Sequence, residues 1–96
     1  MKSKQRAYLR GLANTLQAKY QIGKNGIDTN LLAQLEDALE ANELIKIHVL
    51  ENSDYTAKEA CEEVCESIGA EPVQVIGSKF VIYKKSVNNS KIELPK

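Results

Sequence analysis

The segment 44–50 restricts the possible fold more than any other part of the chain. Apolar and polar residues alternate along it, with Ile45, Ile47 and Val49 in one set and Lys46 and His48 in the other. Successive side chains of a β-strand point to opposite faces of a sheet, so this alternation predicts a strand with one covered face. Because Lys46 and His48 interrupt the segment, no membrane-spanning stretch is expected.

A helix is expected before this strand, near the start of the chain. Ser3 is a candidate N-terminal cap, and the helix is expected to run to about Lys19. Its apolar positions recur at helical spacing, at Leu9, Leu12, Ala13 and Leu16. Lys2, Arg6 and Arg10 recur every four residues and are expected to form one basic stripe.

Two more helices are expected around the alternating strand. Asp28 can cap a helix whose apolar face is Leu31, Leu32, Leu35, Ala38 and Leu39. Thr56 and Glu59 fit a capping box, in which a hydroxyl and a glutamate each bond the other's backbone. This third helix has a buried stripe, and Gly69 is well placed to end it. The stripe comprises Ala60, Cys61, Val64 and Ile68.

Three further strands are expected at Tyr20–Ile22, Pro72–Ile76 and Lys79–Tyr83, the last two joined by a tight turn at Gly77-Ser78. The resulting order is α-β-α-β-α-β-β. Alternating helices and strands favour a right-handed βαβ unit, and the final hairpin makes the sheet mixed. We therefore expect a compact α/β domain with a four-stranded mixed sheet and helices packed against its apolar face.

The length of 96 residues fits one domain. Residues 3–84 carry all the expected elements and form the expected core. Residues 85–96 lack a strong hydrophobic periodicity and are interpreted as a tail, which Ile92 and Leu94 are expected to hold against the domain. The protein is expected to be a monomer.

The charges are unevenly distributed along the chain, although 13 basic and 13 acidic residues cancel. Residues 1–26 hold six basic and no acidic residues, whereas residues 27–71 hold twelve acidic and two basic residues. Residues 72–96 hold five basic residues and one acidic residue. The two ends are therefore expected to form a basic face and the middle an acidic face. The alternative is that the basic groups scatter over the surface.

Signatures of catalysis and of cofactor or metal sites are sparse. The chain has no dinucleotide-binding or nucleotide-phosphate glycine loop, and a single histidine supports no Ser-His-Asp set. Cys61 and Cys65 would need two further ligands to hold zinc, so they are interpreted as small apolar residues. No enzyme activity, cofactor or metal is expected. Two cysteines without a secretory signal favour a reducing compartment, and we expect the cytoplasm.

The stretch Gly23-Lys24-Asn25-Gly26 is the strongest candidate binding site. Glycine allows close approach of a partner, and backbone N–H groups at a helix entrance favour an anion such as phosphate. The alternative is a plain turn that needs two flexible residues. Basic residues elsewhere favour a nucleic-acid backbone as the source of the phosphate, and the few aromatic residues favour structured RNA over single strands.

Several ordered stretches resemble the CRM domain, the chloroplast RNA splicing and ribosome maturation module. They are the segments 4–13, 21–26, 43–47, 69–77 and 81–84, and the single short copy resembles the free-standing bacterial YhbY-type proteins. The resemblance covers about residues 3–95. It implies a fold similar to the C-terminal domain of translation initiation factor three. It also implies RNA binding and association with precursors of the large ribosomal subunit.

The resemblance also implies which residues bind RNA. The Gly-x-x-Gly RNA loop of the family is matched by Gly23, Lys24, Asn25 and Gly26. Its basic first helix is matched by Arg6 and Arg10, and Lys4 is a further candidate there. Basic positions beside the sheet are matched by Lys46 and Lys84. The chain departs from the family where Asn14 replaces a frequent histidine, where Ala18-Lys19 replaces a common proline, and where Lys84 replaces a frequent arginine. The last change removes a possible bidentate phosphate contact.

The sequence therefore predicts a non-catalytic RNA-binding protein that acts in assembly of the large ribosomal subunit, with ribosomal RNA as its partner. The alternative is a protein-interaction module that docks a basic ribosomal protein through its acidic second and third helices.

Overall fold

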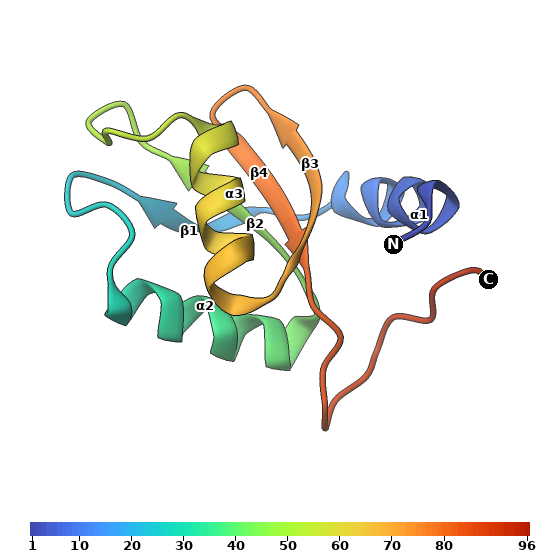
Figure 1. Ribbon diagram of the computed structural model, residues 1–96. Coiled ribbons are helices and arrows are strands. Elements are labelled where there is room, and N and C mark those ends of the chain that lie inside the picture. The colour runs from blue at the N-terminus through green and yellow to red at the C-terminus, as the bar shows by residue number, and fades with distance from the viewer.

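The computed structural model describes residues 1–96 and contains three helices and one four-stranded sheet (Figure 1). In chain order the elements are α1 (Ser3–Ala13), β1 (Ala18–Ile22), α2 (Thr29–Asn42), β2 (Leu44–Val49), α3 (Ala57–Ile68), β3 (Glu71–Ile76) and β4 (Lys79–Tyr83). The predicted order of elements is confirmed. None of the helices is long and apolar enough to cross a membrane.

The sheet is mixed, with the strand order β1-β2-β4-β3. β1 and β2 run parallel and are joined through α2, since parallel neighbours need a long crossover, whereas β4 pairs antiparallel with both β2 and β3. β1 is therefore an edge strand. The predicted fold class, a single α/β domain with a mixed four-stranded sheet, is confirmed.

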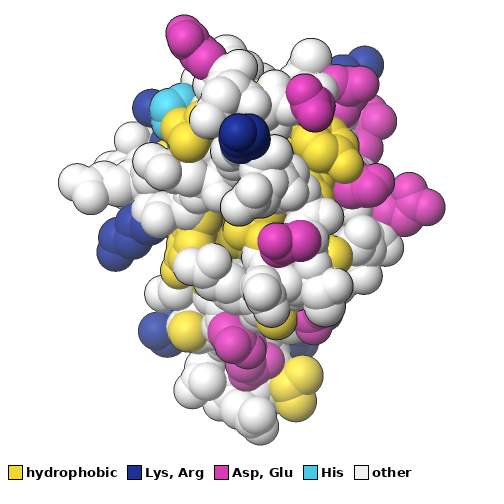
Figure 2. Space-filling model, turned by 90° about the vertical axis from the view of Figure 1, so that its left-hand side faces the viewer, with side chains coloured by type: hydrophobic (Ala, Val, Ile, Leu, Met, Phe, Trp, Pro, Cys, Tyr) yellow, Lys and Arg dark blue, Asp and Glu magenta, His cyan; other side chains and the backbone are white.

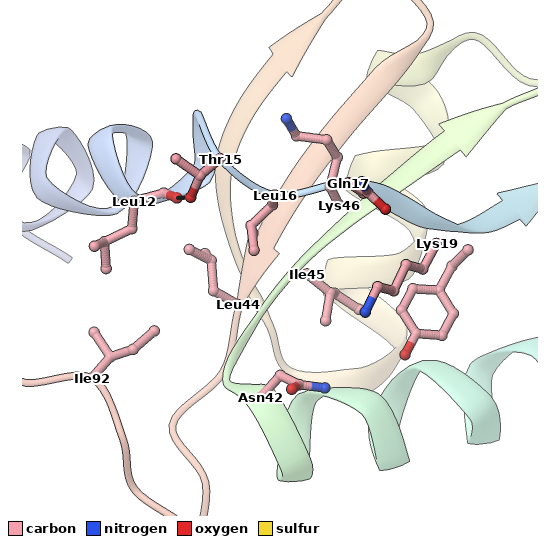
Figure 3. A pocket seen from close by; sticks show the side chains of 11 residues that line it. Leu12, Thr15, Leu16, Gln17, Lys19, Asn42, Leu44, Ile45, Lys46 and Ile92 are labelled. Atoms are coloured by element: carbon pink, nitrogen blue, oxygen red, sulfur yellow. Dashed lines mark hydrogen bonds between the residues drawn. The ribbon is translucent and has the colours of Figure 1, made fainter.

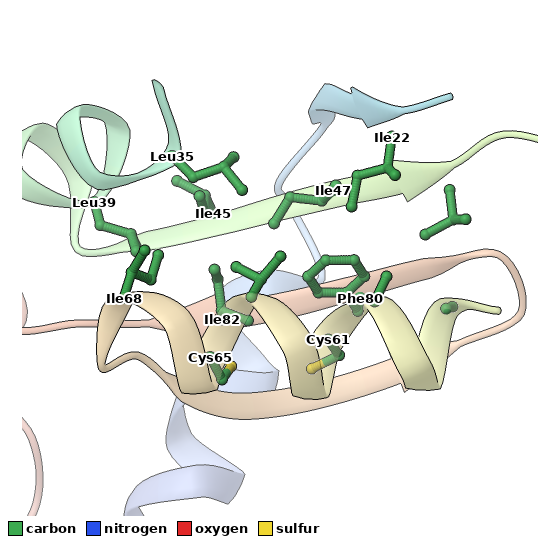
Figure 4. Close-up of a cluster of buried hydrophobic side chains, with 14 of the residues drawn as sticks. Ile22, Leu35, Leu39, Ile45, Ile47, Cys61, Cys65, Ile68, Phe80 and Ile82 are labelled. Carbon is green, nitrogen blue, oxygen red and sulfur yellow. The ribbon is translucent and has the colours of Figure 1, made fainter. Parts of the chain in front are cut away.

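The main core lies between one face of the sheet and the helices α2 and α3 (Figure 4). The predicted alternation of β2 is confirmed, because Ile45, Ile47 and Val49 all point into this core. Phe80 and Ile82 of β4 lie beside them and are fully buried. Burying side chains of this size contributes about 1.5–3 kcal/mol each to folding.

A second, smaller core lies on the opposite face of the sheet, under α1. Leu9 and Ala13 of α1 pack there against Leu44 of β2 and Tyr83 of β4. The expectation of one covered face is therefore wrong at this end of β2, because α1 covers the second face. Farther along β2, Lys46 and His48 lie on that same face beyond α1 and are partly exposed.

The predicted caps of the second and third helices are confirmed. The Asp28 carboxylate accepts the Leu31 N–H at 2.8 Å. Thr56 and Glu59 form the reciprocal capping box, and Gly69 ends α3 in the left-handed conformation, with φ +71°.

Both predicted bounds of the first helix are wrong. Lys2, not Ser3, is the capping residue, and its backbone N–H donates to the Gln5 side chain at 3.0 Å. The helix ends at Ala13 instead of about Lys19. The chain turns there because Ala18 already pairs with Lys46 as the first residue of β1, which starts earlier than expected.

The segment after β4 is fixed to the domain by a buried carboxylate that the sequence did not reveal. Glu43 joins α2 to β2 with φ +65° and is fully buried. Its carboxylate accepts backbone N–H groups from Ser86 at 2.8 Å, Ile92 at 2.7 Å and Lys91. Burial raises the pKa of Glu43, but these hydrogen bonds and the nearby Lys85 charge outweigh it, so the pKa is lowered.

Glu40, one turn earlier in α2, holds the same segment. Its carboxylate accepts the Ser86 hydroxyl at 2.5 Å and the backbone N–H groups of Val87 and Asn88, each at 3.0 Å. These hydrogen bonds lower the pKa of Glu40. Ile92 and Leu94 also pack against the second core, as the sequence predicted.

Candidate nucleic-acid interface

The Gly23–Gly26 loop joins β1 to α2 as a tight turn. The Gly26 N–H donates to the Gly23 carbonyl at 3.0 Å, and Gly26 has φ +69°, a conformation that glycine adopts at little cost. A Cβ on Gly23 would lie 3.4 Å from Leu50 Cδ1, and one on Gly26 would lie 3.5 Å from Tyr55 Cε2. The loop therefore rests on the segment between β2 and α3, which limits its freedom to move.

The two central residues of the loop, Lys24 and Asn25, are exposed at its tip. Their backbone N–H groups donate no hydrogen bond within the protein. Free N–H groups in a tight turn bind anions, and the Lys24 ammonium adds a positive charge beside them. The loop also borders a shallow groove of about 310 Å³, which continues along the first turns of α2 to Gln34.

The N-terminus of α2 is partly occupied by a carboxylate of the protein itself. The Asp28 carboxylate already accepts an N–H group there, and its charge lies in the groove that the loop borders. An anion at the helix entrance, as the sequence predicts, would therefore compete with the Asp28 carboxylate. An anion would bind at the loop amides and Lys24, ahead of the helix.

A second basic region lies on the sheet face that α1 leaves open. The strand register places His48 beside Gln21 of β1 and opposite Lys79 of β4, and Lys46 lies two residues earlier in β2. Lys46 and Lys79 border a hollow of about 210 Å³ with Gln74, Ile76 and Val81. Gln21 is the last but one residue of β1, so this region adjoins the strand end from which the loop leaves.

Figure 2 views the molecule from the side of the Gly23–Gly26 loop. Lys, Arg and His side chains lie along one margin, which is the open sheet face, and Asp and Glu side chains crowd the opposite margin. From this side the two kinds of charge are therefore largely separated, but Lys or Arg side chains also lie among the acidic ones and acidic side chains also lie near the basic margin.

The basic residues of α1 lie at the other end of the same sheet face. The Arg6 Nε donates to the Pro72 carbonyl at 3.1 Å, which ties α1 to the start of β3. Lys4 and Arg10 are exposed. These side chains and the loop thus lie toward opposite ends of a molecule that is 39 Å long.

The structure separates Lys84 from the other predicted RNA-binding residues. Its Nζ donates to the Ile68 carbonyl at 2.7 Å and so satisfies the C-terminal end of α3. Lys84 and Lys85 border a hollow with the acidic residues Glu36, Asp37 and Glu40. The C-terminal basic residues are therefore divided between the two sides of the protein.

The two cysteines belong to the main core. Cys61 and Cys65 are buried and free, one turn apart in α3. The hydrogen bond to Cys61, with burial, raises the pKa of the Cys65 thiol. No group of three or more His, Cys, Asp or Glu side chains is placed to hold a metal ion.

Comparison with known proteins decides the family. The family model of the CRS1/YhbY (CRM) domain matches residues 1–84. The chain belongs to the CRM domain family. It is 40% identical over 92 residues to "Probable RNA-binding protein YqeI" of Bacillus subtilis, with 96% of each chain covered. It is 34% identical over 96 residues to a protein of Haemophilus influenzae named "RNA-binding protein", with 100% of this chain and 96% of the other covered.

A solved structure supports the same fold. The solution structure of a hypothetical protein from Staphylococcus aureus superposes with a TM-score of 0.74, at 44% sequence identity and with 99% of both chains covered. The structural match includes the tail, whereas the CRM family model ends at residue 84.

From the sequence, Lys79 is one of the basic residues that favour a nucleic-acid partner and His48 is a solvated or partner-facing residue, but neither is predicted as part of the binding site. Part of the signal was present, because His48 occupies a polar position of the alternating strand β2, whereas Lys79 is the exposed first residue of an otherwise buried strand. Only the strand register, which pairs His48 with Lys79, shows that they lie together beside the loop.

Proposed function

We propose that this protein binds RNA without catalysing a reaction, and that it acts in assembly of the large ribosomal subunit. The observation that carries the proposal is the Gly23–Gly26 loop, with two free backbone N–H groups and Lys24 at its tip. The names of the CRM relatives support RNA as the partner.

In this proposal the loop holds one phosphate. Lys46 and Lys79 on the open sheet face contact phosphates next to it, and Lys4 and Arg10 on α1 contact the backbone farther along. Lys84 is not part of this interface, because it is bonded to the end of α3 on the other side. With about six phosphate contacts, RNA affinity should fall with salt at a log–log slope of about −4 to −5.

The test is the double variant Lys24→Asp with Asn25→Asp, in a filter-binding assay on large-subunit ribosomal RNA. It removes one positive charge and adds two negative charges beside the free N–H groups, so affinity should fall more than tenfold. Lys58→Asp, at an exposed position in α3, is the matched control and should bind nearly as tightly as the parent. Unchanged binding by a folded double variant would overturn the role of the loop.

The ribosomal part of the proposal needs a separate experiment. The protein should crosslink to RNA in fractionated precursors of the large subunit and much less to mature particles. Equal crosslinking to all cellular RNA fractions would contradict a role in assembly.

A second candidate function is docking of a basic ribosomal protein on the acidic side. Glu62, Glu63 and Glu66 of α3 are exposed, and acidic side chains crowd this margin in Figure 2. Reversal of charge at Glu62 and Glu66 would then reduce association with precursor particles more than changes at Lys24. The RNA proposal predicts the opposite order.

A further inference from the structure

A cavity of about 530 Å³ lies beside the start of β1, at the opposite end of that strand from the Gly23–Gly26 loop (Figure 3). The turn between α1 and β1, strand β2, the end of α2 and the tail all contribute to its walls. Its volume lies in the range that small organic ligands fill. The function proposed above does not use it.

The cavity combines apolar walls with five polar side chains, those of Thr15, Gln17, Lys19, Asn42 and Lys46, of which Lys19 and Asn42 form the pair considered below. Leu16, Leu44 and Ile92 form apolar surfaces, while Lys19 and Asn42 point toward the space beside Ile45 (Figure 3). The Asn42 Nδ2 donates to the Ala38 carbonyl at 3.1 Å, while its Oδ1 accepts no hydrogen bond within the protein and is free as an acceptor. The Lys19 ammonium offers only donors, so the pair presents one acceptor and one donor.

We propose that this cavity receives one unpaired nucleobase of the bound RNA. A base has two flat faces that pack on leucine and isoleucine, and an edge on which a donor lies next to an acceptor. Every base has such an edge, so the two polar groups suit a base without selecting one. The inference rests on the function proposed above, because the rest of the RNA must be bound elsewhere on the protein.

The loop and the cavity are connected along one strand. β1 is an edge strand, and Lys19 and Gln21 are exposed on it, between the cavity and Gly23. Gln21 borders the groove of the loop and Lys19 borders the cavity. Four residues of strand separate Lys19 from Gly23, about 13 Å at 3.3 Å per residue. One RNA strand can therefore place a phosphate at the loop and a nearby base in the cavity.

The experiment is an NMR titration of the whole protein with two single-stranded RNAs. One is a mixed-sequence hexanucleotide, and the other is the same sugar–phosphate chain without bases. The Gly26 amide, which reports phosphate at the loop, should shift with both. The Asn42 side-chain amide and the Leu16 and Ile92 methyl groups should shift only with the RNA that carries bases.

The outcomes separate the two proposals. If the Gly26 amide shifts and the cavity signals do not, or if the abasic chain shifts the cavity signals equally, the base site is overturned and the phosphate loop stands. If no signal moves with either RNA at millimolar concentration, the base site is overturned, while the filter-binding assay on large-subunit ribosomal RNA separately decides the function proposed above.

A variant pair provides an independent measurement. Asn42→Ala removes the free acceptor and should weaken binding of the hexanucleotide about fivefold to tenfold, with no change for the abasic chain. Asn88→Ala, at an exposed position in the tail, is the matched control and should leave both affinities unchanged. Equal affinities of the Asn42 variant and the parent for the base-carrying RNA would contradict the base site.

Discussion

The two ends of α2 use the same chemical groups, backbone N–H donors and an anion, in opposite ways. At the C-terminal end, Glu40 and Glu43 supply the anions and the tail supplies the donors. At the N-terminal end, the loop supplies free donors at Lys24 and Asn25, and no protein carboxylate accepts them. Every buried side-chain polar atom in the protein has a partner. The donors of the loop are exposed instead, so water satisfies them until an anion replaces it.

The largest expected effect comes from the end where the anion is internal. Glu43→Gln should lower the free energy of unfolding by about 3 kcal/mol, because the amide brings donors into a site already filled with donors. Urea unfolding at pH 7 measures it. Glu36→Gln, an exposed position in the same helix, is the control and should change stability by less than about 0.5 kcal/mol. Similar losses for both variants would contradict the anchoring role of Glu43.

The same carboxylates predict how stability depends on pH. The folded pKa values of Glu40 and Glu43 are both lowered from about 4.5. The stability that they contribute is therefore complete above the unfolded pKa and is lost as the pH falls through the lower folded values. The urea midpoint should thus drop as the pH falls from 5 toward 3. The urea midpoint should drop less in Glu43→Gln, because that variant has lost one of the two carboxylates. If the variant and the parent show the same pH dependence, Glu43 does not contribute to it.

A smaller effect should separate two lysines that the sequence placed in one class. Lys46→Ala should weaken binding to large-subunit ribosomal RNA about threefold to tenfold and reduce the salt slope by about 1, with little change in stability. Lys84→Ala should leave RNA affinity unchanged and lower stability by about 1 kcal/mol, because the Ile68 carbonyl loses its donor. Filter binding and urea unfolding of both variants test this. If Lys84→Ala weakened RNA binding and left stability unchanged, Lys84 would belong to the RNA interface.

The smallest effect concerns two glycines in different backbone conformations. Gly26→Ala should destabilise the protein by about 1 kcal/mol, because φ is +69° there. Gly11→Ala should stabilise it by about 0.5–1 kcal/mol, since Gly11 lies within α1 and nothing would contact the added methyl group. Thermal unfolding shows whether each variant is more or less stable than the parent. A stabilising Gly26→Ala would mean that the loop does not require its observed shape.

Local patterns predicted most of the fold. The alternation at 45, 47 and 49, the capping box at Thr56 and Glu59, and the ending of α3 at Gly69 each depend on residues within one or two turns of each other. The first helix was predicted too long because a contact with a distant strand, and not a local pattern, ends it. Leu16 continues its apolar spacing, but Ala18 pairs with Lys46 in β2, and sequence spacing does not show that contact.

The binding region was predicted less completely, because it depends on contacts between distant parts of the chain. The Gly23–Gly26 loop was visible as a motif. The neighbourhood of His48 and Lys79 depends on the pairing of β2 with β4, and the bond of Lys84 to Ile68 depends on how α3 meets the sheet. The role of Glu43 was hidden because its partners lie 43 to 49 residues away.

That separation has a consequence for synthesis of the protein. A ribosome makes Glu43 long before it makes Ser86 and Ile92, so the carboxylate has no partner until the last residues of the chain leave the ribosome. Until the final residues emerge, a nascent chain would either bury an unpaired charge or leave the junction of α2 and β2 open. The closing step of folding therefore belongs to the end of translation, and a nascent chain halted before residue 86 should remain loose at this junction.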